Sequence, residues 1–178
     1  MTIEKSIAGH GIFSSFKDDE AIKLIEFFLY YAAPVNTSPL SLDLSTSLND
    51  ADKGILVSSL LSECGCSKTD FIFIAFADRR ESDLERLKLT DELFVADRSK
   101  GFFWRDVPNS KQKARGAEHE FDCITRHIRN SIAHGRISNK GGYALMEDKS
   151  KKTITMRLLI KPSVLLKWSE SIQERFDK

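Results

Sequence analysis

The clearest fold signal in this chain is the stretch Phe121-Asp-Cys-Ile-Thr-Arg-His-Ile-Arg-Asn-Ser-Ile-Ala-His-Gly-Arg136. At about 100° per residue, its apolar side chains fall within one arc of about 80°, and its polar side chains lie opposite. The apolar set is Phe121, Ile124, Ile128 and Ile132; the opposite set is Arg126, Asn130 and His134, with His127 alongside. Gly135 suits a C-terminal cap. The pattern predicts an amphipathic helix over 113–135.

Further helices and one hairpin are expected around this segment, from apolar residues at helical spacing and from alternating apolar and polar residues. The expected elements are helices over 18–33, 50–64, 83–97 and 162–176, a hairpin over 143–160 with a polar turn at 147–152, and loops over 34–49 and 98–112. The apolar run within 68–79 suits a buried strand or a core helix equally. The sequence therefore predicts a mainly α-helical single domain over 1–178, with a small hairpin before its last helix.

The composition is that of an ordinary globular protein. Of 178 residues, 41% are hydrophobic and 30% charged. The longest apolar run, Phe71 to Ala77, is far shorter than the ~20 residues of a membrane-spanning helix. The first residues lack a basic region followed by an apolar stretch, so no secretory signal is expected. These observations predict a cytoplasmic protein without a membrane partner.

The cysteines do not indicate a metal centre. Cys64 and Cys66 are close in sequence and Cys123 is distant. A single Cys-x-Cys supplies at most two zinc ligands, and no second pair follows. We expect reduced structural thiols, no metal and no cofactor.

The net charge of +1 hides an asymmetry along the chain. Residues 1–60 hold four basic and eight acidic residues, whereas 98–167 hold sixteen basic and six acidic ones. Basic groups interleaved with aromatic ones suit single-stranded nucleic acid, because the former bind phosphates and the latter stack on bases. The candidate RNA contacts are Lys100, Trp104, Arg105, Arg126, His127 and Arg136. The alternative is a solvated basic face around a buried aromatic cluster.

The string Arg129-Asn130-x-x-x-His134 resembles the Arg-x4–6-His motif of the HEPN superfamily. The following hairpin and terminal helix are similar to those of some HEPN proteins of bacterial defence and toxin–antitoxin systems. The resemblance implies a HEPN-like helical bundle, usually dimeric, that cleaves RNA without metal in a toxin or phage-defence role. Arg129 and His134 would be the catalytic pair, with Asn130 supporting them.

The resemblance bears on regulation as well. HEPN toxins that a nucleotidyltransferase antitoxin controls commonly carry a Tyr two places after the His, where this chain has Arg136. Modification by that route is therefore not expected, although an antitoxin protein remains a candidate partner.

The chemistry of the motif follows from its residue types. His134 can exchange protons near neutral pH, and Arg129 can stabilise negative charge on phosphate oxygens. The two residues lie about 140° apart around one helix, so they do not converge easily on one phosphate. A two-fold dimer would bring both pairs into one cleft. The sequence favours a homodimer with a composite site.

Other interpretations of the same residues remain open. Arg126 and Arg129 can pair with Glu118, Asp122 or another carboxylate, and a helical His is often structural. A second functional hypothesis is a non-catalytic HEPN-like dimer that binds RNA, a nucleotide or a partner protein. A metal-dependent nuclease is disfavoured, because the acidic run at 18–20 resembles a helix start more than a metal site.

Overall fold

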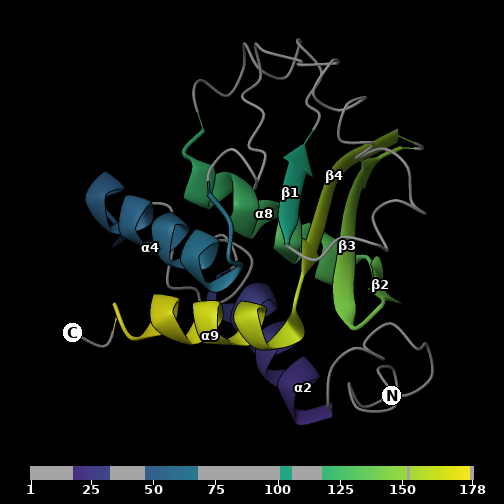
Figure 1. Cartoon of the computed structure of the whole chain (residues 1–178), viewed down its shortest axis with the longest axis horizontal. Helices are drawn as coiled ribbons and strands as arrows, with labels where there is room; N and C mark the ends of the chain where they lie inside the picture. The colour runs from purple at the N-terminus through teal and green to yellow at the C-terminus, as the bar shows by residue number, and fades with distance from the viewer. Residues whose placement is uncertain (1–17, 33–46, 68–100, 106–117, 152, 177–178) are drawn as a thin grey trace.

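The computed structural model describes residues 18–32, 47–67, 101–105, 118–151 and 153–176, which form helices packed with one antiparallel sheet (Figure 1). The helices are α2 (Asp18–Glu26), which continues as the π-helix η1 (Phe27–Tyr31), α4 (Asp50–Glu63), α8 (Glu120–Ala133) and α9 (Pro162–Gln173). The strands are β1 (Phe102–Arg105), β2 (Ile137–Lys140), β3 (Tyr143–Ser150) and β4 (Thr153–Ile160).

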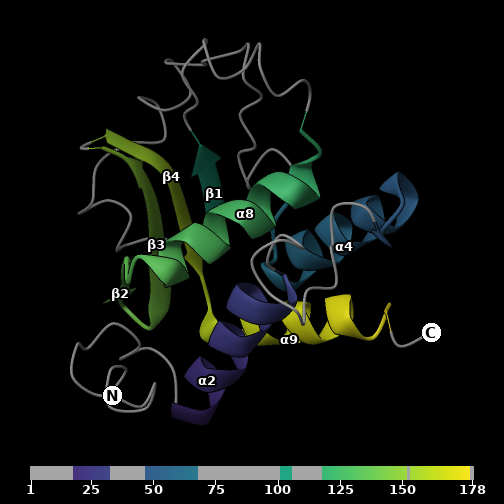
Figure 2. The same ribbon diagram turned by 180° about the vertical axis from the view of Figure 1, so that it is seen from behind.

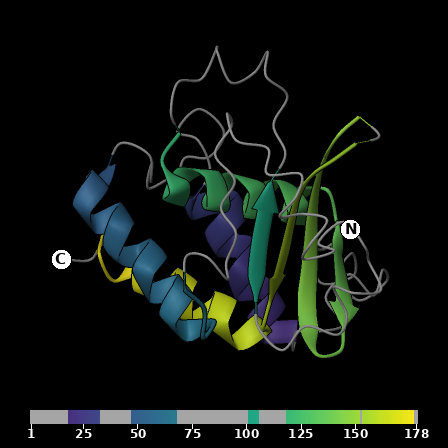
Figure 3. The same cartoon turned by 45° about the horizontal axis from the view of Figure 1, so that its top comes forward.

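The expected helical bundle with a small hairpin is wrong. The predicted hairpin is present as β3 and β4, but the expected turn at 147–152 is wrong in extent, because β3 continues to Ser150 and pairs with β4 over that stretch. Strands β1 and β2 extend the hairpin to a four-stranded sheet in the order β1-β4-β3-β2. Helix α8 lies across one face of this sheet, and α2, α4 and α9 gather at one end (Figures 2 and 3). The described part of the chain is therefore a mixed helix-and-sheet architecture in which the motif helix packs on strands.

Strand β1 lies within the stretch expected to be a basic loop. It pairs with β4 in antiparallel register, with Phe103 opposite Leu158. Four residues are too few to show a clear alternation, and the neighbouring glycine and proline favour a loop. The strand forms because its partner, more than fifty residues away in sequence, supplies the hydrogen bonds of the ladder.

Strand β2 is joined to β3 by a two-residue turn. Lys140 pairs with Tyr143, and the intervening Gly141 and Gly142 have φ of 60° and 84°. Two successive positive φ angles are what a type I′ hairpin turn requires, and glycine adopts them without steric cost. The Gly-Gly pair is thus the local sequence signal for this second hairpin, which is absent from the expected elements.

The motif helix is shorter at its start than predicted. His119 is its N-cap, and its Nδ1 accepts a hydrogen bond of 3.1 Å from the backbone N–H of Phe121. The predicted end is confirmed: Gly135 has φ of 61°, and the N–H of Arg136 donates to the carbonyl of Ser131 over 2.8 Å. This pattern is a Schellman C-cap.

The predicted core face of the motif helix is confirmed. Phe121, Ile124 and Ile128 are fully buried, and Ile132 is nearly so. The ring of Phe121 packs edge-to-face on Trp168 of α9, with centroids 5.7 Å apart. The core therefore joins α8 to the terminal helix as well as to the sheet.

The remaining expectations have mixed outcomes. Helices at 18–33, 50–64 and 162–176 are confirmed, ending at Tyr31, Glu63 and Gln173. The regions 68–79 and 83–97, with nearly all of 34–49, lie outside the described residues. None of the described helices is long and apolar enough to cross a lipid bilayer.

Candidate functional site

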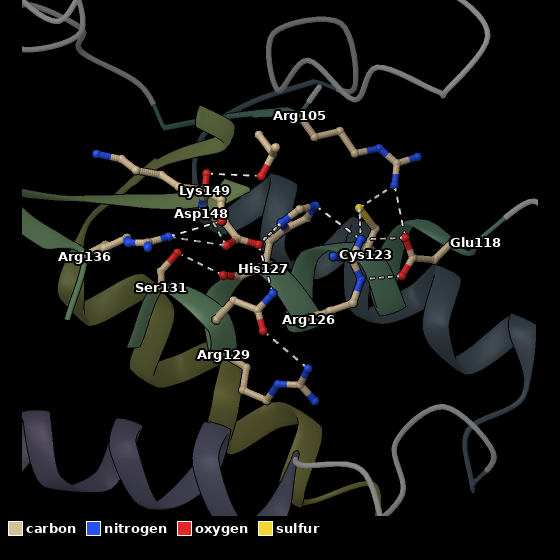
Figure 4. Close-up of polar contacts among 12 residues, drawn as sticks. Arg105, Glu118, Cys123, Arg126, His127, Arg129, Ser131, Arg136, Asp148 and Lys149 are labelled. Carbon is tan, nitrogen blue, oxygen red and sulfur yellow. Dashed lines mark hydrogen bonds and ion pairs between the residues drawn. The ribbon is translucent and has the colours of Figure 1, made fainter. Parts of the chain in front are cut away.

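The polar side of α8 carries a chain of contacting polar side chains that also recruits strand β3 (Figure 4). It runs from Glu118, just before the helix, through Arg126 and His127 to Asp148 on β3, and from Asp148 through Asn130 to Arg129. The two ends of this hydrogen-bonded network differ. Glu118 supplies a carboxylate at one end, and Arg129 supplies a guanidinium at the other.

The centre of the network is the contact between His127 and Asp148. The two side chains are 3% and 8% exposed, and His127 Nδ1 lies 2.8 Å from Asp148 Oδ2. The other ring nitrogen, Nε2, lies 3.2 Å from Nη2 of Arg126. A guanidinium can only donate, so Nε2 accepts and the proton of the neutral ring is on Nδ1, which donates to Asp148. Burial, aided by the charge of Arg126 and opposed by Asp148, holds the pKa of His127 below its ordinary value.

Asp148 accepts hydrogen bonds from several directions. Oδ2 accepts from Nδ2 of Asn130 over 2.9 Å as well as from His127, and Oδ1 accepts from the backbone N–H of Lys149 over 2.8 Å. Arg136 Nη1 lies 4.0 Å from Oδ1. Burial by itself would raise the pKa of Asp148. The hydrogen bonds from His127 and Asn130 together outweigh that effect, so the pKa lies below its ordinary value. Asp148 is therefore a buried, charged carboxylate.

Glu118 closes the other end by binding two arginines. Its carboxylate accepts a fork from Arg126, with Nε–Oε1 and Nη2–Oε2 distances of 2.7 and 2.8 Å, and a contact of 3.3 Å from Arg105 Nη1. Burial raises the pKa of Glu118, but Arg126 and Arg105 bring it below its ordinary value. The structural interpretation of Arg126, as the partner of Glu118, is thus confirmed.

Two of the expected RNA contacts are in the interior. Arg105 and His127 are each 2% exposed, and Arg105 also donates to the thiol of Cys123. Neither side chain is positioned to meet RNA at the surface, because each is packed among internal partners. Arg105 and His127 are therefore structural residues and not RNA contacts.

Arg129 is the end of the network that lacks an acid. Its guanidinium is half-buried, and Nη2 donates to Oδ1 of Asn130 over 3.4 Å. Among the residues that the structure describes, no carboxylate forms an ion pair with it. Burial and the charge of Arg126 lower its pKa, with Asp148 opposing them. A partly desolvated cation without a counter-ion is suited to binding an anion.

His134 lies at the C-terminal end of α8 and is exposed. Its backbone N–H donates to Asn130, but within the described residues its imidazole makes no hydrogen bond or ion pair. Among the described residues, the Asn130 side chain hydrogen-bonds Asp148 and Arg129, and not its i±4 neighbours Arg126 and His134. One chain thus carries Arg129 and His134 on the same helix, with no hydrogen bond between their side chains among the described residues.

The remaining predicted contacts are placed as follows. Arg136 is partly exposed and donates from Nη1 to the carbonyl of Lys149 over 3.3 Å. Trp104 belongs to β1, and the position of its side chain is not described. Lys100 lies outside the described residues.

Other parts of the described structure offer less to an anion or a metal. The hollow between α4 and the start of α8 includes Asp50, Glu118 and Glu120 in its wall, and no Lys or Arg among its described lining residues. No group of three or more His, Cys, Asp or Glu that could hold a metal ion occurs in the described ranges. The three cysteines are free thiols, and burial raises the pKa of Cys64 and of Cys123 to about 12.

Asp148 was missed because the sequence around it is typical of a polar turn. The signal was nevertheless present: Ala144, Met146 and Asp148 alternate on one strand face, and all three are buried. An acid that continues an apolar stripe must find donors. His127 and Asn130, spaced three apart on one helix face, supply them.

Comparisons of the chain with models of protein families, with curated proteins and with solved structures find no match. The functional argument therefore depends on the geometry and chemistry of the described residues.

Proposed function

We propose that this protein is a metal-independent endoribonuclease that cleaves single-stranded RNA at the polar face of α8. The observation that carries the proposal is the half-buried guanidinium of Arg129, which has no carboxylate partner among the described residues and shares a helix with the exposed imidazole of His134. The first group suits a phosphate, and the second suits proton transfer. Both residues belong to the segment 98–167, in which basic residues outnumber acidic ones. An excess of positive charge favours RNA binding.

The reaction uses the nucleophile that RNA itself carries. The 2′-oxygen attacks the adjacent phosphorus while its proton passes to a neutral His134. The bond from phosphorus to the 5′-oxygen breaks, and that oxygen takes a proton from a protonated His134. Arg129 stabilises the charge that grows on the non-bridging oxygens. The products are a 2′,3′-cyclic phosphate and a 5′-hydroxyl.

Two copies of the chain provide the two histidines that this scheme needs. Since Arg129 and His134 lie about 140° apart around one helix, a homodimer with a composite site supplies one group from each side. The cellular role that we propose is that of a cytoplasmic toxin or phage-defence effector, with an antitoxin protein as a candidate partner.

The test is cleavage of labelled single-stranded RNA by the purified protein in excess EDTA, with analysis of the product ends. We expect cleavage by the wild type, loss in His134→Ala and in Arg129→Ala, and retention in the control Lys167→Ala, which changes an exposed lysine on α9. DNA of the same sequence should remain intact because it lacks the 2′-hydroxyl.

Other outcomes would contradict the proposal. Equal cleavage by wild type and His134→Ala would place the chemistry elsewhere. Binding of RNA without cleavage by the wild type, weakened in Arg129→Ala but not in His134→Ala, would identify a non-catalytic RNA-binding module.

A further inference from the structure

We propose that Asp148 is the positioning residue of this site: it sets the orientation of the Asn130 amide, and through that amide it aims the guanidinium of Arg129. This inference rests on the proposed function, because it assigns a role to the arginine of the motif. Asp148 lies on β3, outside the motif helix, and its carboxylate is the only side-chain acceptor that the structure gives the Asn130 amide nitrogen within its described residues.

The chemistry of the amide makes its orientation depend on Asp148. Asn130 donates through Nδ2 to Asp148 and accepts through Oδ1 from Arg129. If the amide were turned by 180°, its oxygen would face the carboxylate and its NH2 group would face the guanidinium. Both of those contacts are repulsive, since they pair acceptor with acceptor and donor with donor. The charge of Asp148 therefore selects the orientation that holds Arg129.

Asp148 is itself held firmly enough to serve as a reference point. His127 and the backbone N–H of Lys149 donate to its two oxygens at 2.8 Å each. The register of β3 against β4 shifts between Asp148 and Lys149. Such irregularities re-aim side chains and are frequent beside functional sites. The carboxylate thus joins strand β3 to the helix that carries the motif.

The location of Asp148 argues against a role in packing alone. It continues the buried face that Ala144 and Met146 begin, where an apolar side chain would fill the space without desolvating a charge. What an apolar residue cannot do is accept from His127 and Asn130 at once. The series of hydrogen bonds from Asp148 through Asn130 ends at Arg129, whose guanidinium is available to bind an anion.

The experiment compares Asp148→Asn with Glu147→Gln. The second variant is a matched removal of charge at the preceding residue of β3. Glu147 forms ion pairs with Arg157 and Lys149, and it makes no hydrogen bond to Asn130 or Arg129 among the described residues. For RNA cleavage we expect Asp148→Asn to lower kcat by about 10²-fold with a small change in KM, as for a displaced catalytic group. Glu147→Gln should leave kcat within about two-fold of the wild type on the same reasoning.

A double-mutant cycle separates positioning from general damage. If Asp148 acts through Asn130, Asp148→Asn should cost kcat little once Asn130→Ala is present. An equal loss in both backgrounds would overturn the inference, because it would mean that Asp148 supports the fold or acts by another path.

NMR of the Asn130 side-chain amide and the Arg129 Nε–H tests the inference independently of cleavage. We expect both signals to shift in Asp148→Asn and to stay in place in Glu147→Gln. If Asp148→Asn does not fold, Asn130→Ala replaces it, and the Arg129 signal must then move. An unchanged Arg129 signal would overturn the positioning role. A wild type that cuts no RNA would overturn the proposed function, and the NMR result alone would then decide the inference.

Discussion

The Nδ1 nitrogen of His127 lies 2.8 Å from the Oδ2 oxygen of Asp148, and this buried contact joins helix α8 to strand β3. The same carboxylate oxygen accepts from Asn130, so the contact also connects the sheet to the Arg129–His134 motif. The interior of the protein and the proposed site are therefore parts of one hydrogen-bonded system. Predictions about stability and about RNA follow from it.

Acid should weaken the fold through His127. An unfolded histidine titrates near 6.5, and burial lowers the pKa of His127 in the folded protein. Between those two values the unfolded chain binds more protons, so the free energy of unfolding falls as pH drops from about 6.5 toward the folded-state pKa. We expect urea titrations from pH 7.5 to 5.0 to show this loss in the wild type and a smaller one in His127→Gln. A pH-independent difference between the two proteins would contradict the assignment.

Glu118→Gln should destabilise the protein strongly. The change removes the carboxylate that neutralises Arg126 and faces Arg105, which is 2% exposed. Removing one partner of a fully buried ion pair typically costs about 3–5 kcal/mol, and because Glu118 is partly buried we expect a loss at or below the lower end of that range. Glu63→Gln is the control, since it removes an exposed pair with Lys167 worth at most about 1 kcal/mol. If chemical denaturation shows the same loss of unfolding free energy in both variants, Glu118 and its two arginines are exposed to water.

Ile128→Ala should cost about 2–5 kcal/mol of unfolding free energy, the usual range for truncating a buried aliphatic side chain. Ile128 is fully buried on the core face of α8, whereas Ile55 on α4 is 52% exposed. Ile55→Ala should therefore change stability by less than about 1 kcal/mol. Thermal and urea unfolding of both variants measure the contrast, and similar losses would argue against the packing of α8 described above.

Arg129→Ala should reduce the salt dependence of RNA binding. Each phosphate neutralised on a single strand contributes about 0.7 to the slope of log K against log salt concentration. Loss of the Arg129 contact should lower the slope by about that amount, whereas Lys167→Ala should leave it unchanged. Fluorescence anisotropy with labelled RNA over a salt series provides the slopes. An Arg129→Ala slope equal to that of the wild type would place phosphate binding elsewhere.

The elements with local signals were predictable from the amino-acid sequence alone. The apolar spacing of Phe121, Ile124 and Ile128 predicted the buried face of α8, and Gly135 predicted its end, because helix periodicity and capping depend on residues within a few positions of each other. The hairpin and the terminal helix were predictable for the same reason.

The four-stranded sheet and the partners of the polar residues depend on long-range packing. Strand β1 forms through its pairing with β4. Arg105 and His127 can be buried because Glu118 and Asp148 accept hydrogen bonds from them in the interior. A basic side chain looks the same in sequence whether water or a buried carboxylate surrounds it. Its environment is determined by long-range packing, in which residues far apart in the chain compensate each other's charge, and local patterns do not encode that compensation.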